Sequence, residues 1–147
     1  MLAADSTQAD RWRRRALLTM EQQARRDHQP LRRMDVLERL SGLGTAPQQA
    51  KARMALLELQ LDYADPAQVV EELGAMLEQA GPDDMLREEM LYLQSRGLLF
   101  TGREEIAEQR LRQLQDEYPS GRRAAKAGRL LQQRLDEQQR QIGRTQP

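Results

Sequence analysis

Gly102–Pro119 reads GREEIAEQRLRQLQDEYP, and this stretch decides the fold. Glycine at its start and Tyr-Pro at its end are helix-ending signals, and most residues between them favour helices. Glu104 and Glu105 lie in the expected first turn, where the helix dipole favours negative charge. No alternation of polar and apolar residues indicates a strand. We therefore expect a helix that ends near Glu117.

The leucines of this helix belong to a pattern that recurs every 37 residues along the chain. A shift of that size superposes leucines in three registers and prolines in a fourth. The superposed sets are Leu40, Leu77 and Leu114; Leu56, Leu93 and Leu130; Leu61, Leu98 and Leu135; and Pro82 with Pro119. Repetition at a fixed interval of this size indicates stacked helical hairpins, each of which buries its apolar face against the next.

Proline, glycine and capping residues divide the chain into about seven helices. We expect the first to be capped by Asp5 or Ser6, the third by Thr45 and the seventh by Ser120. The expected helices cover about 5–26, 30–41, 45–64, 65–80, 83–101, 102–117 and 120–142. The turns between them are short, so neighbouring helices are expected to be antiparallel. No run predicts a strand, and the fold class is all-α.

The predicted domain is single and covers 5–142. It consists of hairpins at about 5–43, 46–82 and 83–119, followed by a capping helix over 120–142. That last helix is rich in Gln, Asp, Glu and Arg, as the exposed end of a helical stack requires. Residues 143–147 are predicted to form a disordered tail.

The stretch over 102–119 is similar to the second helix of a tetratricopeptide repeat. Small residues fall where two helices of that motif approach closely, and bulky residues fall beside them. The small positions are Ala107, Ser95 and Val70; the bulky ones are Leu111, Leu91, Leu98 and, as a departure from the motif, Gly74; Pro119 is the closing proline. The resemblance implies a right-handed superhelical stack of hairpins (an α-solenoid) with a concave groove for a partner protein or peptide. The segment around Glu117–Gly121 also resembles tetratricopeptide proteins of the bacterial envelope, which serve outer-membrane assembly or coordinate division.

Composition excludes several other classes. The chain has 23 basic and 23 acidic residues, with basic ends (+3 over 1–45 and +3 over 99–147) around an acidic centre (−6 over 46–98). This distribution argues against a continuous nucleic-acid footprint. Absence of cysteine excludes disulfides and thiolate catalysis, and no apolar run is long enough to predict a membrane span. No signal peptide is predicted, which leaves a cytoplasmic protein or a mature or trimmed periplasmic one as alternatives.

No constellation of residues predicts catalysis. His28 is the only histidine, and we expect it to be a solvated loop residue. The acidic pairs point about 100° apart on helices and so do not converge on a substrate. Gly42-Leu43-Gly44 lacks the context of a phosphate loop and is interpreted as a helix stop. We therefore expect no enzyme activity, cofactor, metal or small-molecule substrate.

The first helix carries tryptophan within a run of arginines. Trp12, Ala16, Met20 and Ala24 follow one another at i+4 spacing, so we expect this stripe to be buried against the second helix, with the arginines as a solvated rim. The alternative is a contact of Trp12 and the arginines with a membrane surface or a nucleic acid.

The concave side of the predicted stack is the candidate binding surface. Tyr92, Arg96 and Phe100 lie on one helix face at i, i+4 and i+8, and aromatic and arginine residues are typical of binding hot spots. The predicted groove residues are Gln22, Arg26, Leu59, Tyr63, Tyr92, Arg96, Leu99, Phe100, Arg129 and Gln133. For Tyr63 and Phe100, packing into the core between hairpins remains an open alternative.

These features predict a non-catalytic scaffold or adaptor that binds a partner protein or peptide. The resemblance implies a role of this kind in bacterial envelope assembly. Two alternatives stay open: a self-associating helical protein that forms homo-oligomers, and an Arg-rich binder of RNA or a membrane surface.

Overall fold

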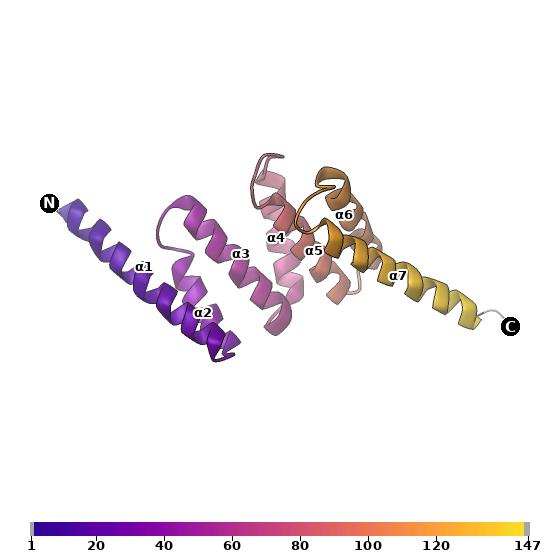
Figure 1. The fold of residues 1–147 in the computed structure, drawn as a ribbon, viewed down its shortest axis with the longest axis horizontal. Coiled ribbons are helices and arrows are strands. Elements are labelled where there is room, and N and C mark those ends of the chain that lie inside the picture. The colour runs from indigo at the N-terminus through magenta and orange to yellow at the C-terminus, as the bar shows by residue number, and fades with distance from the viewer. Residues whose placement is uncertain (1, 146–147) are drawn as a thin grey trace. The chain divides into compact units, whose positions relative to one another are not determined.

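The computed structural model describes the backbone of residues 2–145 and the side chains of residues 6–145. This part of the chain forms seven α-helices and contains no strand, as predicted (Figure 1). The chain divides into two compact units, Met1–Asp65 and Pro66–Pro147, which we call the N-terminal and C-terminal units.

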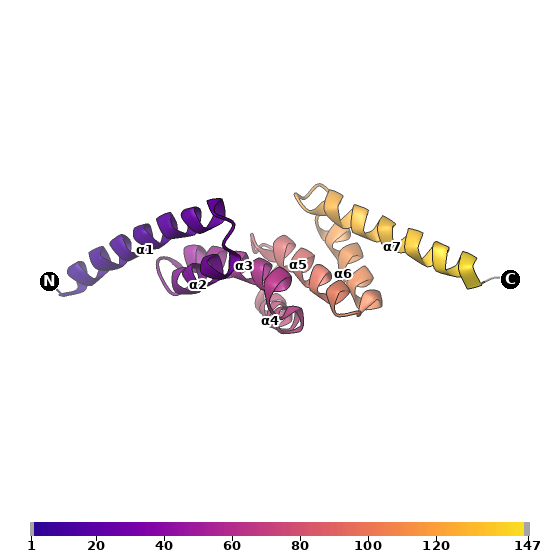
Figure 2. The ribbon, with the colours of Figure 1, turned by 90° about the horizontal axis from the view of Figure 1, so that it is seen from below.

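Three helices make up the N-terminal unit: α1 (Leu2–Arg26), α2 (Pro30–Leu40) and α3 (Ala46–Tyr63). Both α1 and α3 pack against α2, and each reverses direction relative to it (Figures 1 and 2). The α3 helix begins as predicted: the Thr45 hydroxyl accepts a hydrogen bond from the backbone N–H of Gln48, and the Gln48 side chain accepts one from the N–H of Thr45. This reciprocal pair satisfies two N–H groups that the helix itself leaves unpaired.

Two features at the ends of α1 depend on local sequence. The helix begins at Leu2, so the prediction that Asp5 or Ser6 caps it is wrong; the preceding Leu-Ala-Ala segment favours helix and extends it. At the other end, His28 adopts a φ of 52°, and the N–H of Gln29 donates to the carbonyl of Ala24. A left-handed residue after the last turn is a common way to end a helix.

The core of the N-terminal unit lies between α2 and α3. Buried leucines and a valine form it, and Leu17 of α1 packs at its side. Its buried members are Val36, Leu37, Leu40, Leu56 and Leu59.

The buried face of α1 differs from the predicted stripe. Trp12 is 62% exposed, and Ala16 and Met20 are exposed too; only Ala24 of that stripe is buried. The residues of α1 that turn inward are instead Leu17, Glu21 and Ala24. The N-terminal half of α1 extends past α2 (Figure 1).

Four helices make up the C-terminal unit: α4 (Pro66–Gln79), α5 (Arg87–Phe100), α6 (Glu104–Glu117) and α7 (Ala124–Thr145). Each packs against the next in chain order. Only the first half of α7 contributes buried residues, Ala127 and Arg134, and its second half projects beyond α6 (Figures 1 and 2).

The α5–α6 hairpin buries the small and bulky residues that its sequence pattern predicted. Ser95 and Ala107, at the small positions, are fully buried, as are Leu91 and Leu111 at bulky positions. Leu98 packs with Val70 and Ala107 in one cluster. Helices approach closely where their facing residues are small, so this burial follows from the pattern.

Three predicted boundaries in this unit are wrong. The fifth helix begins at Arg87 instead of near Asp83, because residues 81–86 form turns in which the Asp84 carboxylate accepts from the N–H of Leu86. The seventh begins at Ala124 instead of after Ser120, because the N–H of Arg123 is held by the Glu88 carboxylate. The tail expected at 143–147 is helical through Thr145, and residues 146–147 lie outside the described residues.

The hairpins predicted at 5–43 and 83–119 correspond to the packed pairs α1–α2 and α5–α6. The hairpin predicted at 46–82 crosses from one unit to the other, so it stays a prediction, as does the single domain over 5–142.

Candidate functional site

Two of the predicted groove residues are largely buried. Leu59 is 8% exposed and belongs to the core of the N-terminal unit. Tyr92 is also 8% exposed. Leu59 nevertheless lines a hollow together with Tyr63, whereas little of Tyr92 reaches the surface. That these two side chains line one groove stays a prediction.

Tyr92 is covered by a residue far away in sequence. The Arg123 guanidinium, in the turn before α7, lies 4.8 Å from the centre of the Tyr92 ring. Its Nε and a terminal nitrogen donate to the two oxygens of Glu89, at 2.7 Å and 2.5 Å. This cation–π and ion-pair contact fastens the α6–α7 turn to α5 and closes the ring off from solvent.

The other predicted groove residues lie at or near the surface. Arg96 is half-buried and stands 5.8 Å from the centre of the exposed Phe100 ring. Tyr63 lines a shallow hollow at the end of α1, and Leu99 lines another together with Gln133. The remaining three, Gln22, Arg26 and Arg129, are exposed.

Two concave surfaces of the N-terminal unit form a single groove over α2. Two adjoining hollows, of about 650 Å³ and 180 Å³, share Arg14, Leu18 and Gln48 in their linings. The walls come from α1 and α3, and the floor contains Leu37 and Leu40 of α2. We call this surface the α1–α3 groove. The residues that line it are Thr7, Asp10, Arg11, Arg14, Arg15, Leu18, Glu21, Arg25, Leu37, Leu40, Gly44, Thr45, Gln48, Lys51, Ala52 and Ala55.

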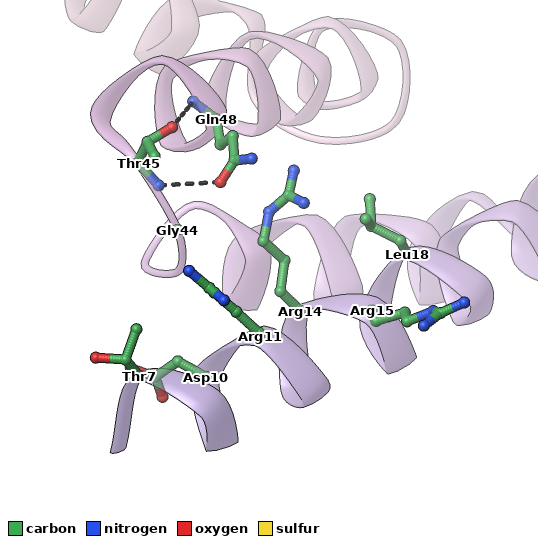
Figure 3. Close-up of a pocket in the computed structure, with 9 residues that line it drawn as sticks. All are labelled: Thr7, Asp10, Arg11, Arg14, Arg15, Leu18, Gly44, Thr45 and Gln48. Carbon is green, nitrogen blue, oxygen red and sulfur yellow. Dashed lines mark hydrogen bonds between the residues drawn. The ribbon is translucent and has the colours of Figure 1, made fainter. Parts of the chain in front are cut away.

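Arginines of α1 stand over the start of α3 at one end of the groove. Figure 3 shows Arg11 and Arg14 extending toward the loop that carries Gly44, while Arg15 lies along α1 and points away from this loop. The φ of Gly44 is 89°, and a Cβ built on it would meet the side chains of Gln48 and Arg14. Glycine is favoured here because this left-handed backbone conformation strains any residue that carries a Cβ.

The carboxylates of the groove are already engaged. Glu21 is buried and accepts from the Nε of Arg33 at 2.6 Å and from Arg25 at 3.2 Å. Asp10 lies 3.7 Å from Arg13. The pair of Glu21 and Arg33 joins α1 to α2 beneath the groove. It also explains why a charged residue occupies the inward face of α1, since a buried carboxylate needs a partner.

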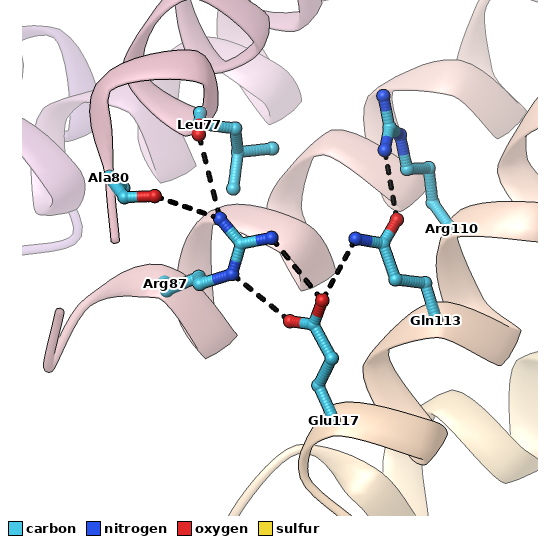
Figure 4. Close-up of polar contacts among 6 residues, drawn as sticks. All are labelled: Leu77, Ala80, Arg87, Arg110, Gln113 and Glu117. Carbon is cyan, nitrogen blue, oxygen red and sulfur yellow. Dashed lines mark hydrogen bonds and ion pairs between the residues drawn. The ribbon is translucent and has the colours of Figure 1, made fainter. Parts of the chain in front are cut away.

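A cluster of polar contacts around Arg87 and Glu117 lies in the C-terminal unit and holds its helices together. Figure 4 shows that the Arg87 guanidinium contacts both oxygens of Glu117, at 3.0 Å and 3.3 Å. It also donates to the carbonyls of Ala80 at 3.0 Å and Leu77 at 3.5 Å, which α4 leaves unpaired at its end. The hydrogen bonds from Arg87 hold the pKa of Glu117 below its usual range, against the opposing effect of burial, and Gln113 assists them.

This geometry predicts a contribution of Glu117 to the pH dependence of stability. Because its pKa is lower in the folded protein than in the unfolded chain, the carboxylate stabilises the fold above the unfolded pKa of about 4.3. That contribution is lost as pH falls through the folded pKa. In urea denaturation near neutral pH and near pH 3, Glu117→Gln should lose less stability on acidification than the wild type. A variant that loses as much as the wild type would contradict this assignment.

Among residues 6–145, no group of three or more His, Cys, Asp or Glu side chains is arranged to hold a metal ion. His28 is exposed and lines the hollow near Tyr63, beside Arg25 and Arg33. None of the helices in the described part of the chain has the length and apolarity to span a membrane.

Comparison with protein-family models, with curated proteins and with solved structures finds no match to the chain. Sequence reasoning did not predict Arg14, Lys51 or the floor of α2 as parts of a binding surface. The sequence does contain a signal for the basic wall, because arginines recur over 11–15. The Gly-Leu-Gly segment that lies near them in the structure comes one helix later in the sequence.

Proposed function

We propose that the protein is a non-catalytic adaptor that holds another protein against its helical hairpins. The observation that carries the proposal is the α1–α3 groove, in which apolar residues lie on the floor and long basic side chains lie on the walls. Surfaces with this combination are typical of helix and peptide recognition, where apolar contacts give affinity and charges at the rim give specificity.

We further propose that the helical hairpins belong to a right-handed, tetratricopeptide-like stack. Support comes from the α5–α6 hairpin, which buries Ser95 and Ala107 at its small positions beside Leu91, Leu98 and Leu111. A hairpin of this kind presents an apolar face that a neighbouring hairpin can cover.

Site-specific photo-crosslinking in the source cell tests the adaptor role. A photoreactive phenylalanine analogue at Leu18, in the groove, should give a discrete crosslinked adduct with another protein. The same analogue at Leu31, which is 71% exposed on α2 and is not part of the groove lining, is the matched control and should give none. Equal adducts at both positions, or none at Leu18, would contradict the proposal.

A further inference from the structure

The α1–α3 groove has the shape of a site for one more helix. Both walls pack on α2. The groove therefore lies between two helices, α1 and α3, and a third helix, α2, lies beneath it. Helices pack with their axes 8–10 Å apart when side chains of one fill grooves of another, and this arrangement leaves one such position open above α2. An extended peptide would fill less of that space.

The apolar residues of the groove indicate that the bound helix should have a single apolar stripe. Leu18 on α1 is 36% exposed, and Ala52 and Ala55 on α3 are half-buried, above the buried Leu37 and Leu40. Small alanines on one wall let another helix approach closely, while Leu18 on the opposite wall supplies apolar contact area.

The net charge of the groove indicates which charge a bound partner should carry. Five cations line it, against the carboxylates of Asp10 and Glu21, which leaves three positive charges in excess. Both carboxylates already contact arginines. Among the described residues, no carboxylate forms an ion pair with Arg11, Arg14 or Arg15. Complementary charge therefore means acidic residues on the rim of the partner.

The length of the basic wall fixes the length of the occupant. From Arg11 to Arg25 the wall follows α1, which at 1.5 Å per residue is about 21 Å, the length of a helix of about four turns. We propose that the α1–α3 groove binds an acidic amphipathic helix of a partner protein, about four turns long, with apolar residues at i, i+3, i+4 and i+7 and carboxylates on both flanks. This inference rests on the proposed adaptor function and specifies the chemical class of the partner.

Other polyanions fit the groove less well. A lipid surface is flat and does not reach a floor enclosed between two helical walls. Nucleic-acid phosphates would engage the arginines but would leave the Leu18 side of the groove without an apolar partner.

A designed peptide tests the proposal on the full chain. The probe is a synthetic amphipathic helix of about four turns with leucines on one face and glutamates elsewhere, and its counterpart has lysine in place of every glutamate. Isothermal titration calorimetry should show binding of the glutamate peptide and none of the lysine peptide. Binding should weaken as salt is raised, because surface charge attraction is screened.

Matched variants locate the binding. Arg11→Glu with Arg15→Glu reverses two exposed cations of the groove and should weaken binding about tenfold or more. Arg32→Glu with Arg39→Glu makes the same change of charge at exposed positions of α2 outside the groove lining and should leave binding nearly unchanged. Leu18→Ser should weaken binding without any change of charge, because it removes apolar area from the wall.

Several results would overturn the proposal. These are equal losses in the two charge-reversed variants, no effect of Leu18→Ser, or tighter binding of a single-stranded RNA oligonucleotide or anionic vesicles than of the glutamate peptide. Light scattering that shows a dimer dissociated by the Arg11 and Arg15 reversals would assign the groove to a second copy of the chain instead. A crosslinked partner at Leu18 without glutamate-peptide binding would sustain the adaptor function and reject this partner class.

Discussion

We expect Leu111→Ala to lower the free energy of unfolding of the C-terminal unit by about 3 kcal/mol. Leu111 lies at the centre of α6 and is fully buried, together with Leu114 of the same helix and Leu91 of α5. Removing its isobutyl group loses the transfer free energy of the buried carbons. A cavity also remains, since the surrounding helices relax only partly.

Leu135→Ala is the matched control for this substitution. It makes the same chemical change on α7, where the leucine is 39% exposed, and it should cost less than about 1 kcal/mol. Native-state hydrogen exchange of the α5 and α6 amides measures the effect in the C-terminal unit itself. Equal losses in the two variants would mean that α6 is not packed as described.

The burial of Leu111 could be predicted because short-range signals and the repeat agree about this hairpin. Proline, glycine and threonine set the ends of α2, α3 and α4 through local conformation alone, which a sequence displays directly. Once the ends of α6 are known, its helical period places Ala107 and Leu111 on one face. The motif that this stretch resembles then predicts Leu91, Ser95 and Leu98 as the facing residues of α5, and these are buried as well.

The orientation of α1 could not be predicted in the same way, because a charged residue lies on its inward face. Hydropathy favours a stripe through Trp12 and Met20, whereas the structure buries Glu21. The partner that makes this burial possible, Arg33, is on the next helix, and no local pattern pairs the two. The groove depends on this rotation. Arg14, Leu18 and Glu21 follow one another at i, i+4 and i+7, so the orientation that brings Glu21 to Arg33 also places Arg14 and Leu18 in the groove lining.

Tyr92 illustrates the same difficulty over a longer distance. Its spacing with Arg96 and Phe100 placed it on an exposed face, and within α5 alone that assignment is reasonable. The residue that covers it, Arg123, comes 31 positions later in the turn before α7. Long-range ion pairs of this kind decide which side chains reach solvent, and they are set by tertiary packing instead of by helical period.

Arg87 holds three elements of the C-terminal unit together, which makes it the second position with a large expected effect. Its guanidinium caps the carbonyl end of α4 from the first residue of α5 and binds the Glu117 carboxylate at the end of α6. Arginine suits this role because its planar group donates in several fixed directions at once. The side chain is largely buried, so solvent replaces these bonds poorly once it is removed.

Arg87→Ala should therefore destabilise the C-terminal unit by about 2 to 3 kcal/mol, because it leaves the Ala80 carbonyl without its partner and Glu117 without its ion pair. Arg87→Lys keeps the charge but loses the two-point contact, and it should recover only part of the loss. Arg112→Ala is the matched control: its pair with Glu108 lies within α6 at an exposed position and is worth about 0.5 kcal/mol or less. Hydrogen exchange at the end of α4 distinguishes the outcomes, since protection there should fall in Arg87→Ala and hold in Arg112→Ala. Undiminished protection in Arg87→Ala would show that α4 ends without help from α5, and the three-way contact would then be incidental to stability.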